Sequence, residues 1–113
     1  MKIHLIRDHA TPVQVAEMLE TLETYIKLAV DIERHVVAGG GRMHAEAEEA
    51  LLADGSRQED IWGADWDPLA QEIQFEALIN IRPRQNNRQM FIRDPEICAR
   101  VEAIVRWIFE EVQ

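Results

Sequence analysis

The sequence has a single cysteine and no long apolar run. Because Cys98 has no second cysteine to pair with, an internal disulfide is excluded, and a reducing cytoplasm suits the chain best. No segment approaches the roughly 20 apolar residues that span a bilayer, so we expect no membrane interaction of that kind. The opening stretch, MKIHLIRDHATP, has an apolar run too short for a signal peptide, which also favours a cytoplasmic location.

Basic charge is scarce as well. Twelve lysines and arginines face 21 aspartates and glutamates, which gives a formal charge of −9. General binding to nucleic acids or anionic membranes depends on basic surface, so neither is expected, although a local basic patch remains compatible with an acidic body. With 113 residues, 47% of them hydrophobic, the chain is predicted to form a single domain, residues 1–113, with a real core.

Capping residues followed by apolar periodicity indicate three helices. Thr11 and Pro12 open the first, and Gln14 completes a capping box. A second helix is predicted over His44–Ala53, and Gly55 is placed to end it. The last helix starts at an Asp-Pro pair, and its apolar stripe consists of Ile97, Val101, Ile104, Val105, Ile108 and Phe109.

Alternation of apolar and polar residues indicates the strands. They are expected over residues 3–6, 25–34, 58–66 and 73–82, with Gly63 as a possible bulge in the third. A short connection joins the last two, which suggests an antiparallel hairpin. The prediction is an α+β fold, in the order β-α-β-α-β-β-α, with helices over the apolar face of a small, mainly antiparallel sheet.

Four polar residues form the first candidate site. Asp31 and Glu33 are two apart in one predicted strand, and Asn80 and Arg82 are two apart in another, so each pair projects from one face. If the strands are neighbours, all four side chains meet. They would bind a divalent metal, position a water, or make ion pairs on a solvated face, and alternation alone would make that face polar.

Glycines precede the second helix and form another candidate. Gly40 and Gly41, in the run AGGGR, allow close backbone approach, and the first amides of a helix can hold an anion. Arg42 would reinforce such a site. The run matches no established phosphate-binding motif, however, and a plain turn into a helix explains it equally.

Metal ligands are a further possibility. His44 and Glu48 lie four apart and share a helix face, so they could share a metal ion with each other, while Asp31 and Glu33 are the other metal candidates. A divalent metal is therefore the only cofactor that the sequence suggests. The helix lacks a second histidine, and a solvated acidic helix face accounts for the same residues.

The segment RPRQNNR, residues 82–88, is the strongest signal. Arginine presents a planar fork that suits carboxylates and phosphates, and Pro83 stiffens the exit from the strand, which aims Arg82. Asn87 and Arg88 end the segment. It either binds an anionic ligand or is held by the protein's own acids, such as Asp31, Glu33, Asp60 and Asp65.

Tryptophans add an expectation about assembly. Trp62 and Trp66 share a strand face, which favours core packing or a subunit interface. Trp107 lies beside the apolar stripe of the last helix, where an exposed aromatic edge suits a contact between subunits. We therefore expect a homodimer.

Three blocks carry a resemblance: IKLAVDIERHVVAGGGRMHAEAE, LLADGSRQEDIWGADW and FEALINIRPRQNNRQMFIRDPEI. With them the chain resembles a family of uncharacterised bacterial proteins that is catalogued as a domain of unknown function. The resemblance covers most of the chain, from about Thr11 onward. It implies a single domain and brings no activity or cofactor.

Three interpretations of the function follow. The first is a binding or accessory domain whose polar pocket, formed by the Asp, Glu, Asn and Arg side chains above, takes a small anionic ligand or an acidic segment of a partner. The second is a metal-dependent hydrolase acting on a phosphate ester, for which no nucleophile and no complete ligand set is evident. The third is a structural protein whose polar groups satisfy one another.

Overall fold

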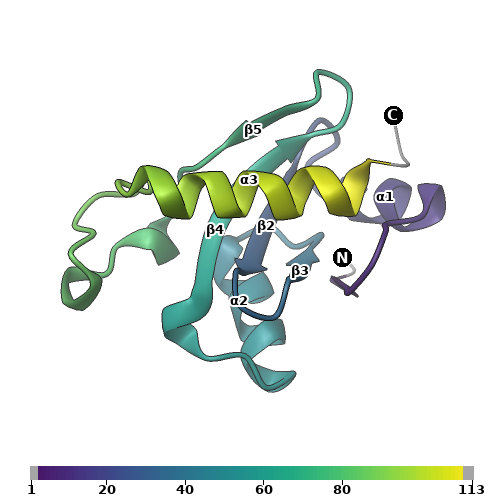
Figure 1. The fold of residues 1–113 in the computed structure, drawn as a ribbon. Helices are drawn as coiled ribbons and strands as arrows, with labels where there is room; N and C mark the ends of the chain where they lie inside the picture. Colours follow the sequence, from purple (N-terminus) through teal and green to yellow (C-terminus); the bar gives the residue numbers. More distant parts are fainter. Residues whose placement is uncertain (1–2, 111–113) are drawn as a thin grey trace.

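The computed structural model describes residues 3–110, which form a five-stranded sheet and three α-helices (Figure 1). The strands are β1 (His4–Ile6), β2 (Ile26–Asp31), β3 (Val36–Gly39), β4 (Ile61–Asp67) and β5 (Glu72–Gln74). The helices are α1 (Pro12–Leu19), α2 (His44–Ala53) and α3 (Pro95–Phe109). The predicted α+β class is confirmed, and the predicted order holds except that it omitted β3.

The strands follow the order β1-β3-β2-β4-β5 in one antiparallel sheet. β2 is central, and β4 runs beside it from the pair Asp31–Ile61 to the pair Ile26–Trp66. The register is continuous across Gly63, so the bulge expected there is absent. A Cβ at position 63 would lie 2.5 Å from that of Ala77, and this close approach explains the glycine.

The long strand predicted over residues 25–34 is too long at its end, where residues 32–34 form a turn. β2 ends at Asp31, whose side chain accepts hydrogen bonds from the backbone N–H groups of Glu33 and Arg34 at 2.9 Å. Such a bond turns the chain, as aspartate does in many tight turns. His35 then adopts a positive φ of 57°, and β3 returns from Val36 beside β2.

The strand predicted over residues 73–82 is also too long. β5 ends at Gln74, and residues 75–77 pair instead with residues 90–92. The chain then turns through two 3-10 helices, η2 (Leu78–Asn80) and η3 (Pro83–Gln85). Residues 58–60 are likewise a 3-10 helix, η1 (Gln58–Asp60), which leads into β4.

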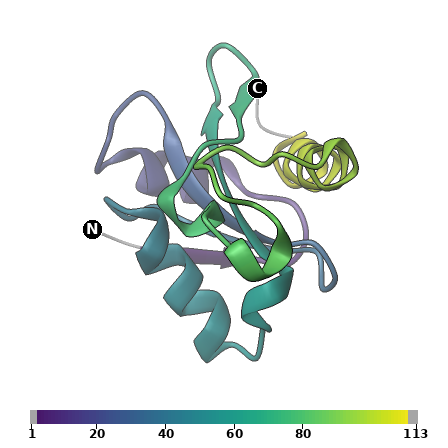
Figure 2. The ribbon, with the colours of Figure 1, turned by 90° about the vertical axis from the view of Figure 1, so that its left-hand side faces the viewer.

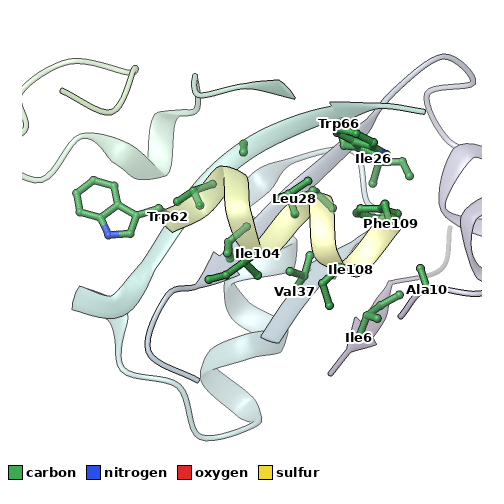
Figure 3. Close-up of a cluster of buried hydrophobic side chains, with 14 of the residues drawn as sticks. Ile6, Ala10, Ile26, Leu28, Val37, Trp62, Trp66, Ile104, Ile108 and Phe109 are labelled. Atoms are coloured by element: carbon green, nitrogen blue, oxygen red, sulfur yellow. The ribbon is translucent and has the colours of Figure 1, made fainter. Parts of the chain in front are cut away.

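Helices α1 and α3 cover one face of the sheet, where the larger core lies (Figure 3). Its largest fully buried side chains include Trp62, Trp66, Phe109 and Leu28. Trp66 stacks on Phe109 with ring centroids 5.6 Å apart. Both strand tryptophans are therefore core residues, one of the two roles expected for them.

Helix α2 covers part of the opposite face, which was expected to be polar. Figure 2 shows α2 and α3 on opposite sides of the sheet. Ala47 and Leu51 of α2 pack on Ala29, Ala38 and other buried residues of this second core. The sheet thus has helices on both faces, and only the parts that α2 leaves uncovered are open to a ligand.

Candidate functional site

Asp31 and Glu33 do not share a strand face, because the chain turns between them. Asp31 is fully buried, and its Oδ1 atom caps the turn, while Oδ2 has no hydrogen-bond partner among the described residues and lies 4.0 Å from Arg34 Nη1. Glu33 is exposed, and its side chain accepts a hydrogen bond from Arg100 at 3.0 Å. The expected meeting of these two carboxylates with Asn80 and Arg82 is therefore wrong.

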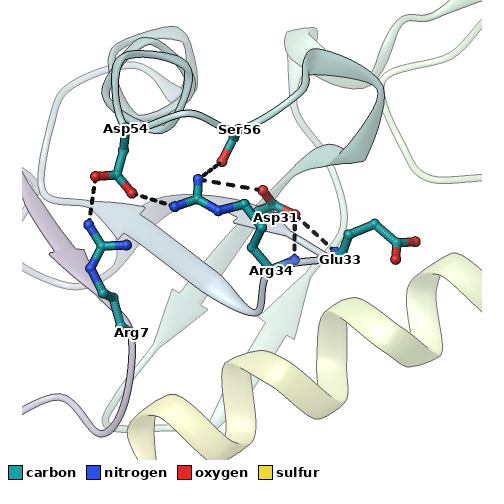
Figure 4. Close-up of polar contacts among 6 residues, drawn as sticks. All are labelled: Arg7, Asp31, Glu33, Arg34, Asp54 and Ser56. Atoms are coloured by element: carbon teal, nitrogen blue, oxygen red, sulfur yellow. Dashed lines mark hydrogen bonds and ion pairs between the residues drawn. The ribbon is translucent and has the colours of Figure 1, made fainter.

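Arg34 of this turn and Arg7, which follows β1, both bind Asp54 at the end of α2 (Figure 4). Arg34 donates from Nη2 to Asp54 Oδ2 and from Nη1 to Ser56 Oγ, both at 2.7 Å. Arg7 donates from Nη2 to Asp54 Oδ1 at 2.6 Å. The hydrogen bonds from Arg7 and Arg34 lower the pKa of Asp54 to about 2.

Replacing Asp54 with asparagine is expected to lower the free energy of unfolding at neutral pH. The folded-state pKa is depressed, so the stabilisation is present above the unfolded pKa of 3.8 and is lost as the pH falls towards 2. Urea unfolding of the parent and of Asp54→Asn measures this between neutral pH and pH 2. The free energies of unfolding of the two proteins should differ at neutral pH and converge as the pH falls towards 2. A difference that persists unchanged to pH 2 would contradict the assignment, as would an equal cost of the substitution in an Arg7→Gln background.

Asn80 is fully buried and takes the place of a neighbouring strand beside Gly63. Its Oδ1 accepts from Gly63 N–H at 2.7 Å, and its Nδ2 donates to Gly63 O at 3.0 Å. Nδ2 also lies within hydrogen-bond distance of the carbonyl oxygens of Met90, at 3.1 Å, and Phe75, at 3.4 Å. This amide completes the edge of β4 at the point where β5 has already ended.

Asn87 holds the following segment by the same chemistry. It is 3% exposed, and its Nδ2 lies 2.7 to 3.1 Å from the carbonyl oxygens of Asn80, Gln89 and Phe91. Its Oδ1 accepts from Arg93 N–H at 2.9 Å. Residues 78–93, called the arm below, are thus fixed by two buried amides. Neither amide is available to a ligand.

Arg82 also serves the fold, through partners that the sequence did not indicate. Its Nη2 donates to Glu48 Oε2 of α2 at 2.8 Å, and its Nη1 donates to Gln58 O of η1 at 2.7 Å. The guanidinium lies 5.5 Å from the ring centroid of Trp62. Burial lowers the pKa of Arg82 while Glu48 raises it, and the group stays charged. The arm is thereby joined to α2 and η1.

Three other arginines of the arm remain free. Arg84, Arg88 and Arg93 are exposed, and within residues 3–110 their guanidinium groups make no ion pair or hydrogen bond. The arm contains no aspartate or glutamate that could neutralise them. The RPRQNNR segment therefore divides: Arg82 and Asn87 face inward, and Arg88, expected as a ligand-binding residue, is open to solvent.

Gly40 and Gly41 precede an anchored helix start. Gly40 has a positive φ of 113°, as a tight turn requires. The backbone N–H groups of Arg42 and Met43 donate to Glu46 Oε1 at 2.9 and 3.0 Å, so the protein's own carboxylate occupies these amides. The glycines therefore form the turn before α2. An anion could bind the N–H groups of Arg42 and Met43 only by displacing the Glu46 carboxylate.

The expected metal ligands lie apart and have other partners. His44 Nε2 lies 2.7 Å from Asp65 Oδ1, Glu48 pairs with Arg82, and Asp31 caps its turn. Over residues 3–110 there is no group of three or more His, Cys, Asp or Glu side chains that could hold a metal ion. Among the described residues, neither of the two expected pairs, His44 with Glu48 and Asp31 with Glu33, is therefore part of a group that could hold a metal ion.

A cleft opens where α2 begins and β5 ends, and we call it the His44 cleft. Its volume is about 570 Å³, and it is lined by Tyr25, Lys27, Met43, His44, Ala45, Asp65, Gln74, Glu76, Ala77, Leu78, Ile79 and Met90. Of these, the sequence had singled out His44 as a metal ligand and Asp65 as one of the acids that could hold the arm. Lys27 was visible merely as a polar position of an alternating strand, and only the strand register places it opposite Asp65.

Trp107 is 40% exposed on α3, and its ring lies 4.7 Å from that of His9, measured between centroids. The exposed aromatic edge expected from the sequence is present. The homodimer inferred from it stays a prediction.

Residues 4–108 match the model of a family described as protein of unknown function (DUF5674). Neither the curated proteins nor the solved structures gave a match to the chain. Within residues 3–110, no helix combines the length and the apolar character needed to cross a membrane.

Proposed function

Because the chain belongs to this family, whose function is unknown, we propose its function from its own side chains: it is a binding or accessory domain whose arm holds an acidic segment of a partner protein. The observation that carries the proposal is a set of three guanidinium groups, those of Arg84, Arg88 and Arg93, which are unpaired within residues 3–110 and stand on a stretch of 16 residues without a carboxylate. Guanidinium forks suit carboxylates and phosphates.

The arm is well suited to binding because its backbone is already ordered. Asn80 and Asn87 fix its carbonyl and N–H groups from inside, and Arg82 fixes its position against α2. A segment held in one conformation loses less entropy when a partner arrives than a flexible loop would. The free arginines therefore stand on a rigid support.

Apolar exposure on the same arm favours a peptide over other anions. Ile81 is 42% exposed and Phe91 50% exposed, which suits apolar side chains interspersed with the partner's acids. The arm contributes four arginines to a chain of −9, so the rest of the protein carries −13. A long polyanion such as a nucleic acid would meet that repulsion beyond the arm, whereas a short peptide would not.

The test uses a fluorescein-labelled peptide of alternating glutamate and leucine, titrated with the protein at low and high salt. Removing three charges with Arg84→Gln, Arg88→Gln and Arg93→Gln is expected to weaken binding by about tenfold or more. The matched control variant replaces three exposed arginines outside the arm, Arg42, Arg57 and Arg106, with glutamine. Its affinity for the peptide should differ little from that of the parent protein.

Three outcomes contradict the proposal. They are an equal loss in both triple variants, absence of binding to the parent protein at about 1 mM, and tighter binding of a single-stranded oligonucleotide than of the peptide. If a glutamate-only peptide binds as tightly as the mixed peptide, Ile81 and Phe91 do not contribute to the binding of the peptide.

A further inference from the structure

We infer that the His44 cleft binds a small amphipathic zwitterion, of the class of an apolar amino acid, independently of the three free arginines of the arm. The sequence assigned no ligand to this set of residues. Leu78, Ile79 and Met90 of the arm line the cleft, but none of the three free arginines does. The cleft's volume, about 570 Å³, falls within the usual range for small-molecule sites.

The floor of the cleft is a row of three polar side chains from three adjacent strands. Lys27 of β2 lies opposite Asp65 of β4, which lies opposite Gln74 of β5. Because side chains alternate along each strand, all three project from the same face of the sheet. Directly opposed residues have Cβ atoms about 5 Å apart, so Lys27 and Asp65 place a positive and a negative side chain at neighbouring positions of one face.

These charges are available to a ligand. Asp65 and Lys27 oppose each other, yet no ion pair of 4.0 Å or less joins them, and Asp65 Oδ1 is held by His44 Nε2 at 2.7 Å. Among residues 3–110, the ammonium of Lys27 and the carboxylate of Glu76 at the rim make no hydrogen bond or ion pair. A ligand's carboxylate would therefore reach Lys27, and its ammonium would reach Asp65 and Glu76.

The wall of the cleft is apolar and unusually open to solvent. Met43, Leu78 and Met90 line it and are 54%, 63% and 39% exposed. Unbranched methionine side chains adapt to ligands of different shape. Such a wall next to a charged floor fits a molecule with an apolar side chain beside paired opposite charges, and it does not fit a purely polar ion.

The test is a titration of the isotope-labelled protein with L-leucine, in which NMR monitors the chemical shifts of the backbone amides of Ala45 and Leu78. We expect saturable shifts at both amides. N-acetyl-L-leucine, which lacks the ammonium, and L-leucine methyl ester, which lacks the carboxylate, should each bind about tenfold or more weakly, because each loses a charge-assisted contact.

Lys27→Met should weaken L-leucine binding and abolish the difference between L-leucine and its ester. Glu76→Gln, at the exposed rim, tests the ammonium contact in case Lys27→Met fails to fold, and Arg57→Met outside the cleft is the matched control. The inference is overturned if L-leucine, L-methionine and L-phenylalanine all leave both amides unshifted, or if the acetylated or esterified form binds as well as the parent amino acid. The triple arm variant should bind L-leucine normally, which separates this result from a failure of the arm proposal.

Discussion

Replacing Asn80 with alanine is expected to lower the free energy of unfolding by about 3–5 kcal/mol, because it strands several buried backbone groups at once. The N–H and C=O groups of Gly63 both lose their partner, and Met90 O loses a donor. Asn80→Asp should be nearly as damaging, since it keeps an acceptor for Gly63 N–H but sets a carboxylate oxygen against Gly63 O. Urea unfolding monitored by circular dichroism measures both variants.

The matched control is Gln89→Ala, because Gln89 is an exposed amide of the same arm. It should stay within about 0.5 kcal/mol of the parent. If Asn80→Ala is as stable as Gln89→Ala, the buried amide does not hold the sheet edge, and the arm is not anchored as described.

Arg82→Ala is expected to cost about 3 kcal/mol or more, because breaking a buried ion pair leaves its partner charged and unpaired. The side chains of Arg82 and Glu48 are only 10% and 13% exposed. Arg82→Lys should recover little of that loss, since an ammonium cannot serve Glu48 and Gln58 O with the same fork or stack as well on Trp62. Thermal and urea unfolding at low and high salt give the comparison.

Arg84→Ala is the control for this prediction, since Arg84 is exposed and unpaired among the described residues. Equal destabilisation by Arg82→Ala and Arg84→Ala would show that the ion pair with Glu48 contributes nothing special. If Arg82→Ala is as stable as the parent, the ion pair with Glu48 does not stabilise the fold. Arg82 would then be grouped with the arginines that bind a ligand.

Helices were predictable because their signals are local. The capping box of Thr11 and Gln14 is present with both reciprocal bonds, at 3.1 and 2.9 Å. His44–Ala53 has the bounds that were predicted, and Asp94 caps α3 through a bond from Glu96 N–H. Each of these features depends on residues within one or two turns of the chain, which is the range that a sequence pattern covers.

Strand ends and the site were not predictable in the same way. Alternation continues from Ile26 past Asp31, but a side-chain bond to the backbone turns the chain there. Likewise, Asn80 sits at a polar position of an alternating run, and nothing local indicates that its amide reaches Gly63, 17 residues away. The sequence did predict that Arg82 would pair with an acidic residue of the protein. It did not indicate Glu48 as the partner, because that contact depends on where α2 packs.

The central claim is that the arm divides its arginines, with Arg82 holding the fold and the other three left for a partner. Urea unfolding of the triple variant Arg84→Gln, Arg88→Gln, Arg93→Gln tests this most directly, without any ligand. We predict a free energy of unfolding within about 0.5 kcal/mol of the parent, since the three groups have no partner to lose among the described residues. A loss comparable to that of Arg82→Ala would contradict the claim, because it would show that these arginines are already engaged in the folded protein.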